Sequence, residues 1–296
     1  IGFKSVFRVC NEPEIFSNGY QFKFNSNSNL RKKRQDIKLG YILPEWIDKP
    51  DNAIIKSNTN IILPYKDSLT AKEKARIGDI KPDLLMFLNK LKRLEINDLN
   101  RRKRILVEKL QEGNIFTLRQ TTYFSGQVSE RARNSYFVID RQDIRVPDVV
   151  KAEQRKGVKK TRIILAFPLD TKSRLLAEED QYVYSYLPIS QEGFRFIIQA
   201  DFILTTGREG IDEDNAWNQW VRDEVAETFK KAINELKNHP VFKYTYLLFI
   251  PRKNDILNDF WEPVASAIIE YCLNSRVILS DNETWCKPSD IITASP

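Results

Sequence analysis

Apolar residues in the middle of the chain occur in short runs, each bounded by polar or turn-forming residues. Runs of this kind, rich in β-branched and aromatic residues, are typical of strands. The pattern predicts strands at 105–107, 115–118, 136–139, 163–167, 182–187 and 194–204.

The N-terminal region carries the clearest turn signal. Asn18-Gly19 separates two segments of alternating polarity, 14–17 and 20–24. Asn-Gly between two such segments favours a β-hairpin, because both turn residues must adopt φ > 0. The apolar segment 60–63 is predicted to be a buried strand.

The last third of the chain has helical periodicity. Apolar residues recur every three or four positions from Trp217 to Leu236, and Asp214 or Asn215 is placed to cap the start of this helix. The same spacing predicts a second long helix over 257–272. Shorter elements are expected at 2–9 and 84–91, both helical, and at 277–279, a strand.

A charge-rich segment at 67–82 without large apolar clusters is the best candidate for a linker. It would divide the 296 residues into an N-terminal part, 1–66, and a larger part, 83–296. Strands dominate the first part, and strands followed by helices make up the second. The prediction is therefore an α+β fold.

Composition mainly excludes some classes of protein, such as membrane-spanning and disulfide-rich ones. With 42% hydrophobic and 29% charged residues, the chain is typical of soluble globular proteins. No apolar stretch approaches the ~20 residues of a membrane helix, so we expect no membrane partner. We expect a cytoplasmic, intracellular location, with the nucleus left open. The three cysteines lack metal-binding spacing, which fits a reducing compartment.

The chain has one histidine, His239, and one methionine, Met86. His239 immediately precedes Pro240 at the expected end of a helix, which argues against a Ser-His-Asp triad, and a single histidine leaves no multi-histidine metal site. Because the chain begins at Ile1, we expect an internal piece of a longer protein, in which other residues would complete the chemistry.

The first candidate binding site lies at the start of the N-terminal helix. Gly2-Phe3 would expose free backbone N–H groups there, and the helix dipole adds partial positive charge. Such a helix start favours an anion such as phosphate. An ordinary helix start is the alternative interpretation of so short a motif.

The second candidate follows an unusual strand. Gln199 and Asp201 interrupt the apolar run 194–204, and Arg208 follows a loop-forming Thr-Thr-Gly. A buried polar group without a partner costs ~1–3 kcal/mol, so two such residues are unexpected in a plain strand. An edge strand with a surface arginine is the alternative interpretation.

Both candidate segments resemble one protein family. Residues 1–5 resemble the end of the glycine box of the GHKL, or Bergerat-fold, ATPases, which include heat-shock protein 90. The segments 13–24 and 59–63 resemble the ATPase module shared by sacsin and the NO VEIN proteins. The segment 199–209 resembles the stretch of the heat-shock protein 90 middle domain whose arginine touches the γ-phosphate. Its continuation through 217–224 is closer to the sacsin and NO VEIN group.

The resemblance implies the C-terminal part of a Bergerat-type α/β sandwich, followed by a mixed-sheet α/β middle domain with C-terminal helices. It implies that Ile1, Gly2, Phe3 and Thr59 bind ATP and that Arg208 is catalytic, neutralising the γ-phosphate. The family's catalytic glutamate, Mg²⁺-binding asparagine and adenine-binding aspartate would lie before Ile1. ATP and Mg²⁺ are therefore expected cofactors of the complete protein, and this chain alone is expected to be inactive.

Basic runs at 31–34, 101–104 and 155–160 support a different function. Such runs usually form solvated loops or strand faces, but they can also contact phosphates. The alternative to a chaperone-like or switching ATPase is therefore a non-hydrolysing platform for nucleic acid or an acidic protein. A degenerate fold that binds nucleotide without hydrolysis is a third hypothesis. A protein client, nucleic acid and a second copy of the chain stay open as partners.

Overall fold

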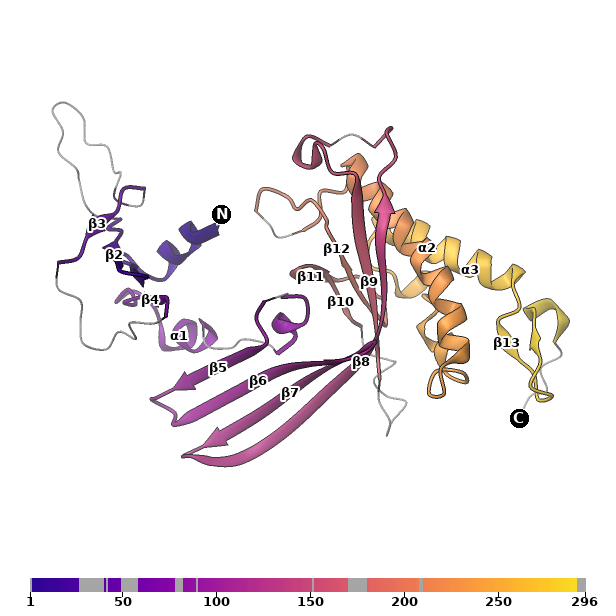
Figure 1. Ribbon diagram of the computed structural model, residues 1–296, viewed down its shortest axis with the longest axis horizontal. Coiled ribbons are helices and arrows are strands. Elements are labelled where there is room, and N and C mark those ends of the chain that lie inside the picture. Colours follow the sequence, from indigo (N-terminus) through magenta and orange to yellow (C-terminus); the bar gives the residue numbers. More distant parts are fainter. Residues whose placement is uncertain are drawn as a thin grey trace. The chain divides into compact units, whose positions relative to one another are not determined.

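A computed structural model of the chain describes residues 2–26, 40, 42–48, 58–77, 82–88, 90–150, 152–169, 180–207 and 210–291. The chain divides into two units, 1–80 and 81–296, which are described separately (Figure 1). Both contain antiparallel strands and helices, so the fold is of the mixed α+β class.

Unit 1 is built on a four-stranded antiparallel sheet with the strand order β3-β2-β1-β4. The predicted hairpin is confirmed, since Asn18 and Gly19 adopt φ of 48° and 85° between β1 and β2. The elements of this unit are η1 (Gly2–Arg8), β1 (Glu14–Ser17), β2 (Tyr20–Lys23), β3 (Glu45–Trp46), β4 (Asn60–Ile62) and α1 (Ala71–Ile77).

One prediction for unit 1 needs correction, and the predicted linker contains an additional element. The strand at 60–63 exists as β4, but it is an edge strand that pairs only with β1, and Ile61 is 53% exposed instead of buried. The segment 67–82 contains the helix α1. Its first turn is fixed by a capping box, in which Thr70 Oγ1 and Glu73 Oε2 each bond the other residue's backbone N–H. A short exposed helix stabilised by capping has no apolar stripe for periodicity to reveal.

Unit 2 contains an eight-stranded sheet with the order β11-β10-β12-β9-β8-β7-β6-β5. All neighbours are antiparallel except β10 and β12, which run parallel. The strands are β5 (Arg93–Asp98), β6 (Lys103–Glu112), β7 (Ile115–Phe124), β8 (Gln127–Arg145), β9 (Lys160–Pro168), β10 (Tyr182–Ser185), β11 (Leu187–Gln191) and β12 (Ile197–Ala200).

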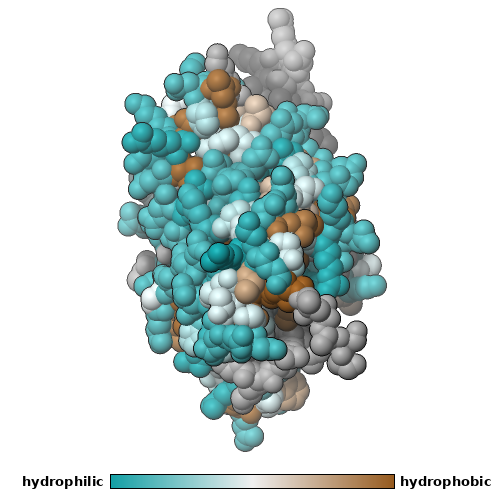
Figure 2. All heavy atoms as spheres, turned by 90° about the vertical axis from the view of Figure 1, so that its right-hand side faces the viewer, coloured by the Kyte–Doolittle hydropathy of each residue, from teal (hydrophilic) through white to brown (hydrophobic). Residues whose placement is uncertain are grey.

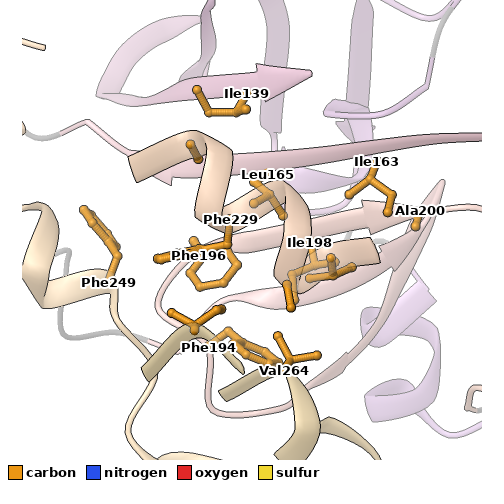
Figure 3. Close-up of a cluster of buried hydrophobic side chains, with 14 of the residues drawn as sticks. Ile139, Ile163, Leu165, Phe194, Phe196, Ile198, Ala200, Phe229, Phe249 and Val264 are labelled. Atoms are coloured by element: carbon orange, nitrogen blue, oxygen red, sulfur yellow. The ribbon is translucent and has the colours of Figure 1, made fainter. Parts of the chain in front are cut away.

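Two long helices, α2 (Ala216–Asn238) and α3 (Glu262–Asn274), belong to the core on one face of this sheet. Aromatic residues take part in this core, where Phe196 contacts both Phe194 and Phe229 of α2 (Figure 3). The predicted cap is confirmed, because Asn215 Oδ1 accepts the N–H of Trp217 at 3.0 Å. The second helix begins later than predicted, and Leu257 is 67% exposed in the segment before it.

The other face of the sheet is covered in part by the segment that includes η2 (Pro82–Leu85). The α-helix predicted at 84–91 is wrong, since only this 3-10 turn forms before the chain enters β5. Leu85, Met86 and Phe87 are nevertheless buried, packed in a second core cluster with residues of β6 and β7. A compact apolar turn and a helix share the same local density of apolar residues, so the pattern alone did not separate them.

Smaller elements complete unit 2. The predicted strand at 277–279 forms as a two-residue strand, β13, paired with β14. The remaining elements are η3 (Glu153–Arg155), η5 (Tyr246–Phe249), η6 (Lys253–Asp255), η7 (Asp259–Trp261), β13 (Ile278–Leu279), β14 (Trp285–Cys286) and η8 (Pro288–Asp290).

The exterior carries no large continuous apolar surface in the view of Figure 2, where hydrophobic residues appear in small groups among hydrophilic ones. Within the described ranges, none of the helices combines the length and the apolar character needed to cross a membrane.

Gly193, shortly before β12, lies in close contact with the backbone of Asp255. Gly193 adopts φ of +84°, and a Cβ at this position would overlap the carbonyl oxygen of Asp255. Gly113 also has positive φ, +56°, but lies in open space. The two glycines thus share the backbone strain of the left-handed region and differ in the steric overlap.

We expect Gly193→Ala to lower the free energy of unfolding by ~2–4 kcal/mol, because backbone must move to admit the methyl group. Gly113→Ala should cost only about 1 kcal/mol, the strain of a left-handed alanine. Urea denaturation of both variants measures the difference. Equal losses would show that the approach of Gly193 to Asp255 is not a constraint on the fold.

Candidate functional site

The residues expected to bind ATP belong to unit 1. Ile1 lies outside the described residues, and Gly2 and Phe3 are the first two residues of η1. The far end of η1 is tied to the rest of the unit, because Lys66 Nζ donates to the carbonyl oxygen of Phe7 at 2.6 Å.

Thr59 lies at a different end of the small sheet. Its hydroxyl is 2.7 Å from that of Ser17, beside the hairpin turn. The segment after η1 joins the sheet at the opposite end, through the bridge between Cys10 and Tyr65. Thr59 is therefore bonded at the end of the sheet opposite to the one that the segment after η1 joins. A shared site for adenine and phosphate stays a prediction.

The catalytic candidate Arg208 lies outside the described residues, but the base of its loop is well defined. Leu204 and Ile211 form an antiparallel bridge. On either side of it, Thr205 N donates to Gly210 O and Asp212 N donates to Ile203 O, both at 3.0 Å. The loop between the two arms is thus closed at its root.

A single buried side chain holds both arms of this loop. Asn218 is 0% exposed, and its Oδ1 accepts the N–H of Ile203 at 2.8 Å. Its Nδ2 donates to the carbonyl oxygens of Ile203 and Asp212 at 2.7 and 2.8 Å. One side-chain amide is therefore hydrogen-bonded to both arms of the loop. The sequence pattern did not single out Asn218, although an asparagine in helical register with Val221 and Val225 was a signal.

The polar residues before the loop are both partnered. β12 is an interior strand between β10 and β9, so the interpretation as an edge strand is wrong. Gln199 Oε1 accepts the N–H of Tyr186 at 2.7 Å, and Asp201 Oδ1 accepts from Arg155 Nη2 at 2.8 Å. The indole N–H of Trp217 donates to the carbonyl oxygen of Asp201 at 2.8 Å.

Three of these residues, Tyr186, Gln199 and Asp201, border a cavity of about 730 Å³. Tyr186, Gln199 and Asp201 reach it from the carboxyl ends of the parallel strands β10 and β12, an edge where ligands commonly bind in open sheets. Lys160 and Arg162 of β9 line it as well. Polar groups from several strands thus converge on one hollow of unit 2.

The electrostatics of this cavity favour an anion. Four cations line it, Lys92, Lys109, Lys160 and Arg162, against two carboxylates. Burial lowers the pKa of Lys109, and its ammonium donates to the carbonyl oxygen of Leu88 at 2.7 Å.

The neighbouring Asp140 keeps its charge beside the cavity. Burial acts to raise the pKa of Asp140, but hydrogen bonds from Arg162 and Gln142 outweigh it, so the pKa lies below its usual value. Arg162 makes two contacts with this carboxylate, at 2.7 and 2.6 Å. The pair fixes the Arg162 guanidinium at the rim of the cavity.

Both carboxylates that line the cavity are ion-paired. Asp143 is held by Lys160 and Asp201 by Arg155, both at 2.8 Å. Among the described residues, no group of three or more His, Cys, Asp and Glu side chains could hold a metal ion.

Comparison with known proteins finds a relative among curated sequences. The chain is 28% identical to Protein NO VEIN of Arabidopsis thaliana over an alignment of 327 residues, which covers 99% of this chain. The chain spans 11% of the length of that relative. No protein-family model and no solved structure matches the present chain. The similarity agrees with the resemblance to NO VEIN proteins found in the sequence.

The clamp at Asn218 leads to a prediction. Asn218→Ala should lower the free energy of unfolding by ~1–3 kcal/mol, because the buried N–H of Ile203 would lose its partner. The carbonyl oxygens of Ile203 and Asp212 would each keep one backbone donor and lose the amide. It should also speed tryptic cleavage within 205–210 under native conditions. Asn234→Ala, at an exposed position of the same helix, serves as the control.

Chemical denaturation measures the first effect, and mass mapping of early tryptic fragments measures the second. Lower stability without faster cleavage in this loop would show that Asn218 supports the core and not the loop.

Proposed function

We propose that the chain is part of an ATP-driven conformational switch, in which unit 2 supplies Arg208 to the γ-phosphate of a nucleotide held by the ATP-binding domain. The observation that carries this proposal is the closed, clamped root of the loop 204–211. The resemblance of the motifs at 1–5 and 199–209 to segments of the GHKL ATPases supports it.

A cation stabilises developing negative charge best when its position is fixed before the reaction, since no reorganisation is then needed. The loop that carries Arg208 leaves the end of an interior strand and returns to a residue bonded by Asn218. Its backbone therefore has little freedom at either arm.

ATP and Mg²⁺ would be held only in part by this chain. Gly2 and Phe3 open a helix, and the first N–H groups of a helix suit phosphate oxygens. When bound with its magnesium, ATP would supply the phosphoryl group that is cleaved. The family resemblance places the Mg²⁺-binding asparagine outside this chain, so no residue here is proposed as a Mg²⁺ ligand.

Arg208→Ala in the full-length protein should lower kcat for ATP hydrolysis about ten-fold or more, each ten-fold being ~1.4 kcal/mol of barrier. ATP affinity should change only a few-fold, because an arginine that acts mainly in the transition state contributes little to ground-state binding. Steady-state ATPase assays and nucleotide titration measure the two quantities.

Arg252→Ala is the matched control, since Arg252 is an exposed arginine of the same unit. Hydrolysis by the Arg208 variant at the parent rate, with ATPase activity present in the parent, would remove the arginine from the reaction.

The chain of residues 1–296 alone should bind ATP with a Kd weaker than about 0.1 mM, because it carries only part of the phosphate site and lacks the adenine anchor. Isothermal titration calorimetry with Mg²⁺-ATP tests this. Micromolar binding by the chain alone would place the nucleotide elsewhere, and the cavity beside Gln199 would become the leading site.

A further inference from the structure

The eight-stranded sheet extends well beyond its helix-covered half. Among the described residues, β8 pairs with β9 from Tyr136 onward, whereas its first part, 127–134, pairs with β7 alone. β5, β6, β7 and this part of β8 form a four-stranded extension, here called the blade. Figure 1 shows β5, β6 and β7 reaching away from α2 and α3.

The strand register places arginines on one face of the blade. Residues opposite each other on paired strands share a face. One row across the strands consists of Arg93, Glu108, Arg119 and Arg133, and the next consists of Glu95, Leu106, Thr121 and Arg131.

A third row adds another guanidinium to this face. Arg104 lies opposite both Asn97 and Tyr123, and its guanidinium sits 4.1 Å from the centre of the Tyr123 ring. These three rows, here called the arginine face of the blade, therefore carry five arginines against two glutamates.

The arginines on this face are unevenly compensated. Glu95 is paired with Arg93 at 3.3 Å and lies 3.8 Å from Arg104. Within the described part of the chain, no ion pair is found for Arg119, Arg131 or Arg133, and all three are exposed. Three exposed arginines without an ion pair among the described residues therefore gather on β7 and the first part of β8, and Glu108 is the carboxylate opposite Arg119.

Arg119 and Arg133 are directly opposite each other on β7 and β8. Like charges in this position destabilise a sheet. An anion bound between them would turn the repulsion into two favourable contacts. The pair is thus an arrangement that costs stability in the free protein and is useful when a polyanion is present.

The opposite face of the blade has a different character. Leu94, Ile105, Val107 and Leu118 face that side and belong to the core cluster that includes the buried residues after η2. The apolar face of the blade thus has partners within the chain, whereas the arginine face has none among the described helices.

The kind of polyanion follows from what lies between the arginines. Thr117 and Thr121 are buried on this face, and the ring of Tyr123 is covered by Arg104, so no exposed aromatic surface is offered for base stacking. Protein partners usually need an aromatic or large aliphatic anchor, and the one exposed apolar side chain in these rows is the small Val128, opposite Tyr123. Guanidinium groups repeated at strand spacing suit the phosphates of a nucleic acid backbone.

We propose that the arginine face of the blade binds the phosphate backbone of a nucleic-acid duplex, with Arg119, Arg131 and Arg133 as the main contacts. Binding would depend on charge and on the regular form of the duplex and not on base sequence. This surface is independent of Arg208 and of nucleotide hydrolysis.

The test compares two triple variants of the 1–296 chain in which the same amount of charge is removed. One is Arg119→Gln/Arg131→Gln/Arg133→Gln, and the control removes exposed charges elsewhere in unit 2, as Arg252→Gln/Lys253→Gln/Lys287→Gln. Fluorescence anisotropy uses DNA and RNA duplexes of about 24 base pairs, the matching single strand and poly-glutamate, over a salt series.

The blade variant should bind duplex at least ten-fold more weakly at about 0.1 M salt. Its slope of log K against log salt should fall by ~2–3, about 0.9 for each phosphate that is no longer neutralised. The control should keep both values near those of the parent. Relative affinities for DNA and RNA duplexes identify which form the blade prefers.

Three outcomes would overturn the proposal: no duplex binding by the parent, equal weakening in the control variant, or poly-glutamate bound as tightly as duplex. The last would assign the surface to acidic proteins. Thermal melting provides the folding check, since removing the Arg119–Arg133 repulsion should leave Tm unchanged or raise it.

Discussion

Burial of one face of the sheet under α2 is the interaction on which the rest of unit 2 depends. Trp217, Val221, Val225 and Phe229 are all almost fully buried along this helix, and each such side chain contributes ~1.5–3 kcal/mol relative to exposure. The same helix carries Asn218 in its first turn, beside Trp217. Packing of the helix therefore also sets the position of the amide that closes the loop 204–211.

The same face of the sheet meets two environments along β8. In its second half, Arg141 is paired with Glu224 of α2 at 2.6 Å, so the charge is compensated by the covering helix. In its first half, Arg131 and Arg133 have none of the described helices above them. One continuous strand, β8, thus packs against the core in its second half and carries exposed charges in its first half.

The sequence predicted the elements that depend on local chemistry. The Asn18-Gly19 turn, the cap at Asn215 and the periodicity of α2 each follow from neighbouring residues, and each is confirmed. The short strand β5 was missed although its exposed and half-buried positions alternate, because its charged residues hide the apolar ones. The helix predicted at 84–91 failed because the position of β6 and β7, not local propensity, decides how that segment packs.

The candidate site could be predicted only in outline. Gln199 and Asp201 were recognised as unusual in a strand, but their partners, Tyr186 and Arg155, are distant in sequence and are brought close only by the fold. Asn218 was missed for a similar reason, since nothing local identifies the two loop arms that it joins.

The position of β12 has a consequence for the order of folding. β5 to β9 form a simple antiparallel succession in which each strand pairs with the next, and such local pairings form early. The β10–β11 hairpin joins the sheet only through β12, which is made later in synthesis and must insert between β9 and β10. During translation, the hairpin therefore waits with an unpaired edge until about residue 200 has left the ribosome, and this interval is where the nascent chain is most exposed to misassociation.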